Sequence, residues 1–377
     1  MKMKKITALL LALAMSLSLA ACGGDSASAG GSTPAPTEPA AQTSESADGS
    51  GQAVVLDENG EVYAEAEDAD VPTEYPVTLT DQAGREVTIE AKPETLVSGY
   101  YISTSLCIAL GLQDQLVGIE AKADTRPIYA RSAPGLLELP SVGTAKEFDL
   151  EGCAALAPDL VILPLKLQDA ADSLAELGIP ALVVNPEDQT LLEEAVALVA
   201  AATDTRARAA QLADFTVKQQ NRLTELLADA ERPNVYLAGN SDFLSTAGGA
   251  MYQSSMIEMA GGRNVAQEIT DTYWASVSYE QILTWNPDYI VLASDADYTV
   301  EDVMTDPNLA GCKAVENGDV LQIPGDAEAW DSPVPGGILG SVWLSGALHP
   351  DLGIDGENMQ IINEFYETFY GFTYQEI

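Results

Sequence analysis

The sequence predicts an α/β protein of two lobes, each with a mostly parallel sheet, joined by one long α-helix. Short apolar runs alternate with helical patterns from residue 95 onward, which is typical of β-α-β architecture. Residues 190–231 contain neither glycine nor proline, which favours a long helix in the middle of the chain. Residues 149–163 and 278–292 resemble each other on either side of it, which indicates two similar lobes.

The first lobe begins with a predicted hairpin. Residues 77–80 and 86–89 alternate apolar and polar side chains, and 81–85 supply turn residues. Apolar runs then predict strands at 95–97, 116–119, 160–163 and 181–184. Helices are expected at 103–110, 150–156 and 168–177, the first and last of them ending at Gly111 and Gly178.

The central helix is expected over about 204–230, after a break near Thr203–Thr205. Its predicted buried stripe recurs at steps of three and four: Leu212, Phe215, Gln219, Leu223, Leu226 and Leu227. The alternation then resumes, with strands at 235–238 and 289–292 and helices at 253–260, 279–285, 338–348 and around 365–370. The expected domains are therefore 75–203, the linking helix 204–231, and 232–377.

The similarity between residues 149–163 and 278–292, an internal repeat, has a local physical basis. Asp149 and Ser278 suit helix N-caps, while Pro158 and Pro287 end the two helices before a strand. Glu151 and Glu280 then fall in the first helical turn, where an acidic side chain complements the helix dipole. A second, weaker echo pairs 104–111 with 254–261, in the same order.

The charge excludes several functions. With 17 Lys and Arg against 58 Asp and Glu, the chain carries −41 at pH 7. Residues 1–21 carry +3 and residues 23–74 carry −12, so −32 falls on residues 75–377. Such a surface disfavours nucleic acid and anionic membrane leaflets. One histidine, His349, leaves little material for His-rich metal sites or catalytic triads, and no cofactor is expected.

The N-terminus is typical of an exported chain. Lys2, Lys4 and Lys5 precede an apolar stretch at 6–19, which predicts a signal peptide over 1–21. The sequence Leu19-Ala-Ala-Cys22 resembles a bacterial lipobox, so Cys22 is the expected lipidation site; a plain secretory signal is the alternative. Residues 22–74 are rich in small, polar and acidic residues, which predicts a disordered acidic stalk behind the lipidated cysteine. The chain is therefore expected outside the cytoplasm, anchored to the outer face of the cell membrane.

Three further cysteines lie in apolar segments. We expect Cys107, Cys153 and Cys312 to be buried thiols that act as small hydrophobic residues. One disulfide plus a free thiol is the alternative in an exported protein.

The motifs together resemble one family. They are Asp81-Gln-Ala-Gly-Arg85, Leu110-Gly111, Leu116-Val-Gly118, Val142-Gly143, Glu151 with Pro158-Asp-Leu-Val161, Met259-Ala-Gly-Gly262 with Asn264, and Glu280 with Pro287-Asp288. The chain resembles the substrate-binding lipoproteins of ABC importers for iron–siderophores, haem and cobalamin over about residues 75–370. The resemblance implies two Rossmann-like lobes joined by a rigid helix, with little closure when the ligand binds between them. It also implies a monomeric, non-enzymatic protein whose partners are an ABC permease with its ATPase, docked through Glu151 and Glu280.

The expected ligand site lies where strands end and helices begin, because clefts of such folds form there. Its candidate residues are Tyr100, Tyr101, Lys146, Lys166, Asn240, Asp242, Tyr273, Trp274, Trp330 and Asp331. The aromatic rings suit a bulky chelate, with burial in the lobe cores as the alternative. The two lysines suit an anionic ligand group, with a solvated surface position as the alternative. No metal site formed by the protein itself is expected, and His349, at a helix end, is expected at the surface.

The substrate expected from this pattern is a metal chelate, either an iron–siderophore or a related iron complex. The predicted cleft loops contain no arginine cluster, which disfavours a strongly anionic catecholate. A corrinoid such as cobalamin, or haem, stays open in the same transport role. A lipid-anchored surface enzyme or a sensor is the alternative of another class, although GxSxG, HExxH and Walker motifs are absent from the sequence.

Overall fold

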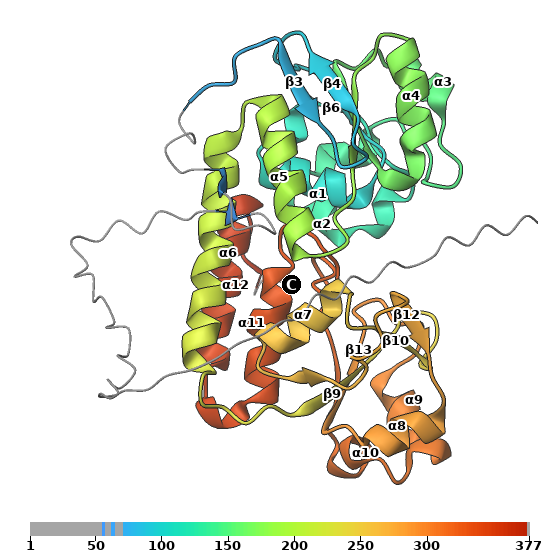
Figure 1. Ribbon diagram of the computed structural model, residues 1–377, viewed down its shortest axis with the longest axis vertical. Helices are drawn as coiled ribbons and strands as arrows, with labels where there is room; N and C mark the ends of the chain where they lie inside the picture. The colour runs from blue at the N-terminus through green and yellow to red at the C-terminus, as the bar shows by residue number, and fades with distance from the viewer. Residues whose placement is uncertain (1–54, 57–61, 65–70, 375–377) are drawn as a thin grey trace, which may run out of the picture. The chain divides into compact units, whose positions relative to one another are not determined.

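The computed structural model describes residues 55–56, 62–64 and 71–374 (Figure 1). Below, the N-terminal lobe denotes residues 71–203 and the C-terminal lobe residues 232–374. The signal peptide, Cys22 and most of the expected stalk lie outside the described residues. Among those that are described, no helix has both the length and the apolar character needed to cross a membrane.

The N-terminal sheet is parallel, in the order β6-β5-β7-β8. Its strands are β5 (Leu96–Ser98), β6 (Leu116–Gly118), β7 (Leu160–Pro164) and β8 (Ala181–Val184). The residues of β5, β7 and β8 are buried throughout, as expected for apolar strands covered on both faces. The helices of this region are α1 (Tyr101–Ala109), α2 (Pro127–Ser132), α3 (Leu150–Ala155) and α4 (Gln168–Glu176).

The hairpin of β3 (Val77–Thr80) and β4 (Glu86–Ile89) is confirmed, and its turn is tied to the sheet. The buried carboxylate of Asp81 accepts hydrogen bonds from the backbone N–H groups of Ala83 and Arg85 and from that of Val183 in β8. It also pairs with the Arg85 guanidinium at 3.0 Å. The Asp81–Arg85 motif therefore docks the hairpin on the edge of the sheet.

The C-terminal sheet mixes parallel and antiparallel strands. Strands β9 (Asn234–Ala238), β11 (Arg263–Asn264), β13 (Tyr289–Leu292) and β14 (Val320–Gln322) pair in parallel. Strands β10 (Ser245–Ala247) and β12 (Trp274–Ser276) extend the sheet antiparallel. The helices are α7 (Tyr252–Met259), α8 (Tyr279–Trp285), α9 (Val300–Thr305), α10 (Lys313–Asn317), α11 (Ile338–Leu348) and α12 (Asp355–Phe369).

Short 3-10 helices join these elements. They are η2 (Gln113–Gln115), η3 (Ala123–Thr125), η4 (Pro134–Glu138), η5 (Leu165–Leu167), η6 (Pro307–Leu309) and η7 (Pro350–Leu352). The sequence pattern did not predict them, nor α2, α9, α10, β10, β11, β12 or β14, because each is too short to show a clear period.

The expected break and long helix are confirmed. Helix α5 (Gln189–Thr203) ends at Asp204, whose positive φ of 59° stops it, and α6 (Arg206–Leu226) follows. The predicted stripe faces the protein, except that Leu226 is 36% exposed at the end of the helix. The Phe215 ring packs 5.2 Å from the ring of Phe365 in α12, and α6 also contacts α11 (Figure 1).

A second connection between the lobes was not predicted. After α12 the chain returns to the N-terminal lobe, where the Tyr370 hydroxyl lies 2.9 Å from that of Ser105 in α1. The Arg208 guanidinium of α6 donates to the carbonyls of Ala109 and Thr368. The end of α12 therefore bridges the N-terminal lobe and the linking helix.

The echo between the halves has a shared hydrogen-bond pattern. Asp159, before β7, accepts from the N–H of Thr95 at the start of β5, at 2.9 Å. Asp288, before β13, accepts from the N–H of Asn234 at the start of β9, at 2.7 Å. Each aspartate therefore ties its strand to the neighbouring parallel strand.

The prediction that residues 22–74 are disordered throughout needs a correction. Strands β1 (Val55–Leu56) and β2 (Val62–Ala64) pair antiparallel inside the segment expected to be disordered, and β2 lies against α5. The Thr73 side chain is 9% exposed and donates to the carbonyl of Ala201. Packing against α5 therefore begins before residue 75, although the polar composition of the segment gave no periodic signal.

The cysteine expectation is confirmed within the described residues. Cys107, Cys153 and Cys312 are free and fully buried. Burial raises the pKa of the Cys107 thiol to about 12 and that of Cys153 to about 11, so both stay protonated at neutral pH.

Candidate functional site

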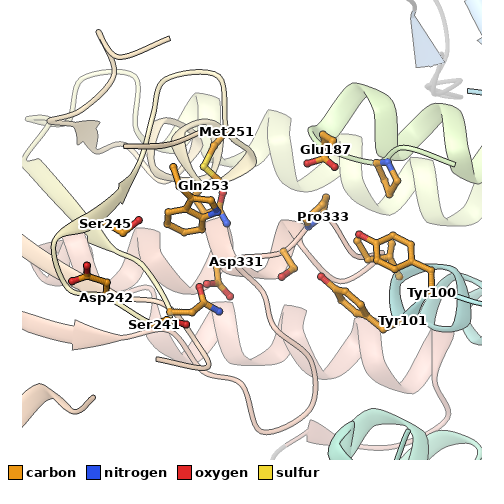
Figure 2. Close-up of a pocket in the computed structure, with 15 residues that line it drawn as sticks. Tyr100, Tyr101, Glu187, Ser241, Asp242, Ser245, Met251, Gln253, Asp331 and Pro333 are labelled. Atoms are coloured by element: carbon orange, nitrogen blue, oxygen red, sulfur yellow. The ribbon is translucent and has the colours of Figure 1, made fainter. Parts of the chain in front are cut away.

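A cavity of about 470 Å³ lies between residues of the two lobes (Figure 2). The N-terminal lobe contributes Tyr100, Tyr101, Ile102, Pro186 and Glu187. The C-terminal lobe contributes Asn240, Ser241, Asp242, Ser245, Met251, Gln253, Trp274, Asp331, Ser332 and Pro333. Tyr100, Glu187 and Asn240 follow the carboxyl ends of β5, β8 and β9, the edge where open parallel sheets form their clefts.

Six of the ten expected ligand-site residues line this cavity. They are Tyr100, Tyr101, Asn240, Asp242, Trp274 and Asp331. Lys146, Lys166, Tyr273 and Trp330 are not among the lining residues. The structure thus brings together residues that lie up to 231 positions apart in the sequence.

The expectation for Trp330 needs a correction, because its side chain belongs to the core. Trp330 is only 1% exposed, and its indole N–H donates to the hydroxyl of Tyr366 in α12 at 2.8 Å. Its ring lies 5.2 Å from that of Tyr374. The polar neighbours of Trp330 in the sequence hid this, since the aromatic partners come from the end of the chain.

The two lysines and Tyr273 also lie outside the cavity lining. Lys166 is exposed in η5 because its neighbour Leu167 turns into the core. Lys146 is exposed in a turn held by the Thr144 hydroxyl, which accepts from the Lys146 N–H. Tyr273 is 53% exposed just before β12, whereas its neighbour Trp274, the first residue of that strand, is 37% exposed and lines the cavity.

Several lining residues were missed by the sequence pattern. Pro186 and Glu187 follow a predicted strand, so the strand-end rule could have identified them. Met251 and Gln253 lie at the start of α7, and Ser245 opens β10, a strand that was not predicted. Their position depends on the antiparallel extension of the C-terminal sheet.

The N-terminal side of the cavity is aromatic. The Tyr100 and Tyr101 rings meet edge to face, with centroids 5.0 Å apart. The Arg126 guanidinium, outside the lining, lies over the Tyr101 ring at 4.3 Å from its centroid. Burial raises the pKa of both tyrosines, so both phenols are neutral donors at physiological pH.

The C-terminal side is polar and acidic. The Asp331 carboxylate is 3% exposed and accepts from the hydroxyl of Ser294 at 2.6 Å and from its N–H at 3.2 Å. Burial raises the pKa of Asp331. Asp242 is exposed, and the Asn240 amide donates to the carboxylate of Asp295. None of the described residues that line the cavity is Lys, Arg or His.

Glu151 and Glu280 lie outside the cavity, one on each lobe. Both are exposed in the first turns of α3 and α8. The Asp149 carboxylate caps α3 by accepting from the Gly152 N–H at 2.8 Å, and the Ser278 hydroxyl caps α8 by accepting from the Gln281 N–H at 3.2 Å. The predicted caps are confirmed, and they present both glutamates to solvent.

Within the described ranges, no group of three or more His, Cys, Asp or Glu side chains is placed to hold a metal ion. His349, expected at the surface, follows α11 in a half-buried position in which its Nε2 is shielded from solvent, and it does not line the cavity.

The chain is similar in sequence to two binding proteins of known name. The molybdate-binding protein MolA of Haemophilus influenzae is 27% identical over 324 residues, which span 79% of this chain and 92% of that protein. The vitamin B12-binding protein of Yersinia pestis is 29% identical over 219 residues, 58% of this chain and 72% of that protein.

Solved structures share the fold. MolA bound to molybdate superposes with a TM-score of 0.70 at 25% identity, covering 79% of this chain and 99% of MolA. The periplasmic heme binding protein HutB of Vibrio cholerae superposes with a TM-score of 0.59 at 23% identity, covering 68% of this chain and 99% of HutB, which shows the fold alone.

Residues 96–327 match the periplasmic binding protein family, a stretch that includes both sheets and most of the cavity lining. The chain therefore belongs to this family, whose members are extracytoplasmic, non-enzymatic solute-binding components of ABC transporters.

Proposed function

We propose that this chain captures a metal chelate, an iron–siderophore or related iron complex, between its lobes and delivers it to an ABC permease. The observation that carries this proposal is the cavity of about 470 Å³ with Tyr100, Tyr101 and Trp274 in its wall. Ligand pockets for small organic molecules span about 300–1,000 Å³ and are rich in aromatic contacts. The rings offer contact area and stacking faces to a bulky chelate.

The charge of the wall weighs against a small oxyanion such as the molybdate that MolA is named for. An oxyanion needs cations or convergent N–H donors, whereas Glu187, Asp242 and Asp331 are carboxylates. A compact oxyanion would also leave most of the cavity to water. A corrinoid is the second candidate, favoured by the similarity to the vitamin B12-binding protein of Yersinia pestis.

A ligand screen tests the proposal. The purified mature chain is titrated with ferric hydroxamate and ferric catecholate chelates, haem, cobalamin and molybdate. Thermal shift and tryptophan fluorescence follow binding, since Trp274 lies in the wall. Binding of a metal chelate at micromolar or lower concentration, with the chelate recovered unchanged, is expected. Chemical conversion of the chelate, or binding of molybdate alone, would overturn the proposal.

The exposed pair Glu151 and Glu280 is proposed as the permease contact. Both carboxylates lie away from the cavity lining, so the protein can hold its ligand and present them to basic permease residues at once. In this proposal the ligand and the permease contact different surfaces of a monomeric binding protein.

The export signal is proposed to end in a lipid anchor on Cys22, which holds the protein on the outer face of the cell membrane. In cells, Cys22→Ser should move the protein from the membrane fraction to the soluble extracytoplasmic fraction. Recovery of the variant in the membrane fraction, or wild-type protein without a lipid by mass spectrometry, would contradict the anchor.

A further inference from the structure

We propose that the cavity selects chelates with a positive charge, and that the cationic group is held on the side formed by Asp242, Asp331 and Gln253. This inference rests on the proposed function, because it names the charge class of the chelate. It concerns the polar and acidic residues of the cavity wall, which have no role in stacking against the chelate.

The first support is a buried carboxylate without a cation. Asp331 is only 3% exposed; Asp242 lies beyond it at the Ser241 end of the cavity, whereas Glu187 lies toward Tyr100 (Figure 2). Among the ion pairs found in the described part of the chain, none includes these three acids. The Ser294 hydrogen bonds satisfy part of the Asp331 carboxylate but leave its charge without a counter-ion. A cationic ligand group would supply that counter-ion at low solvent exposure, where attraction is strong.

The second support is independent of charge. Gln253 lines the cavity at only 7% exposure, and its Oε1 has no hydrogen-bond partner. A buried amide oxygen without a partner is costly, and rotation of the amide can present it to a ligand donor. An ammonium or amide N–H of the ligand would satisfy this oxygen and approach Asp331.

The two sides of the cavity differ in chemistry. Figure 2 shows Tyr100 and Tyr101 at one end, Ser241 and Asp242 at the other, and Asp331 between them. The cation near the aromatic end, Arg126, is stacked on Tyr101 and outside the lining. This arrangement places the bulk of a chelate against the tyrosines and its cationic group toward Asp331 and Asp242.

Two matched pairs of chelates test the inference, and the members of each pair differ in charge. Ferrioxamine B has a free ammonium group, which N-acetylation removes without changing the hydroxamate ligands of the iron. Aquacobalamin is cationic, whereas cyanocobalamin is neutral. For whichever pair binds, the cationic member should bind at least about tenfold more tightly at low salt, as a charge-assisted contact implies, and rising salt should narrow the difference.

Variants locate the effect. Asp331→Asn and Asp242→Asn should each reduce the preference for the cationic member several-fold, while Asp114→Asn, at an exposed position outside the lining, should not. Asp242 is itself exposed, so its variant remains informative if Asp331→Asn does not fold. Equal binding of both members by the wild type, or a preference unchanged in Asp242→Asn and folded Asp331→Asn, would overturn the inference alone. If neither pair binds while another siderophore or haem does, the inference fails and the proposed function stands; if no chelate binds at all, the proposed function fails as well.

Discussion

The two lobes share a framework but differ in what they bring to the cavity. In both, an N-capped helix leads into a buried parallel strand, and an aspartate ties that strand to its neighbour. The N-terminal sheet is parallel throughout, whereas β10 and β12 extend the C-terminal sheet antiparallel. The first lobe contributes two tyrosines to the cavity, and the second contributes most of the polar and acidic wall.

The difference separates two roles. Features in the echoed segments, such as Glu151 and Glu280, occur once on each lobe and suit a partner that contacts both lobes in the same way. Features in the loops beyond the strands are not repeated: one side of the cavity has Tyr100, Tyr101 and Glu187, and the other has Asp242 and most of the polar groups. Under the proposed docking role, the permease contacts follow the repeat, and the proposed ligand contacts lie in the loops that are not repeated.

The largest effect, on uptake in cells, is expected when Glu151 and Glu280 are both changed. Glu151→Ala with Glu280→Ala should abolish uptake in cells while leaving chelate affinity unchanged, because neither side chain lines the cavity. Each single change should give partial uptake if the lobes contribute equally. Loss of chelate affinity with intact uptake would contradict the docking role.

The second largest effect is expected when one aromatic side chain of the cavity wall is removed. Trp274→Ala and Tyr101→Ala are each expected to weaken chelate binding about tenfold or more, since stacking area is lost. Tyr273→Ala is the matched control, because Tyr273 neighbours Trp274 in sequence but is 53% exposed and outside the lining. If Tyr273→Ala weakened chelate binding as much as Trp274→Ala, the loss would not come from the cavity wall, and the prediction would be wrong. The comparison between Tyr101 and Trp274 then measures how unequally the lobes share the ligand.

A pH-dependent effect is expected where the C-terminal lobe meets α1. The Glu328 carboxylate accepts a hydrogen bond from the Ser105 hydroxyl of α1, and burial raises the pKa of Glu328 from 4.5 to about 7, although the Ser105 hydrogen bond and the charge of Arg126 oppose the rise. A raised folded-state pKa means that its contribution is fully present below about pH 4.5 and is lost as pH rises through 7. Glu328→Gln should therefore remove this pH-dependent loss and stabilise the protein at pH 8 by on the order of 3 kcal/mol, at about 1.4 kcal/mol per pH unit between 4.5 and about 7.

Thermal unfolding of the wild type and Glu328→Gln at pH 5 and pH 8 checks this expectation. The other carboxylates titrate in both proteins, so the difference between their pH profiles isolates Glu328. Parallel profiles would exclude a raised pKa at this position.

The smallest effects are expected at the two helix caps. Asp149→Ala and Ser278→Ala should each lower the free energy of unfolding by about 1 kcal/mol. The 2.8 Å bond of Asp149 is shorter than the 3.2 Å bond of Ser278, so the N-terminal cap should contribute more. Urea denaturation of the two variants measures the difference, and a larger loss for Ser278→Ala would reverse this ranking.

Local sequence predicted most of the framework because its signals are periodic. The apolar runs at 160–163 and 289–292 are strands, and the stripe from Leu212 to Leu223 is the buried face of α6. The strand-end rule also identified Tyr100, Asn240 and Asp242 as cavity residues. It could not place Trp330, whose partners Tyr366 and Tyr374 come from the end of the chain, or Gln253, whose position depends on α7 and the added strands.

By itself, the sequence determined the α/β class, the two-lobe repeat, the linking helix and the positions of Glu151 and Glu280. Hydrophobic period, capping residues and turn residues act over a few positions, so they can be read without a structure. Only the tertiary structure decided which loops form one cavity, which aromatic rings fill the core, and that the chain after α12 returns to α1. Those outcomes depend on contacts between residues far apart in the chain, which no local pattern encodes.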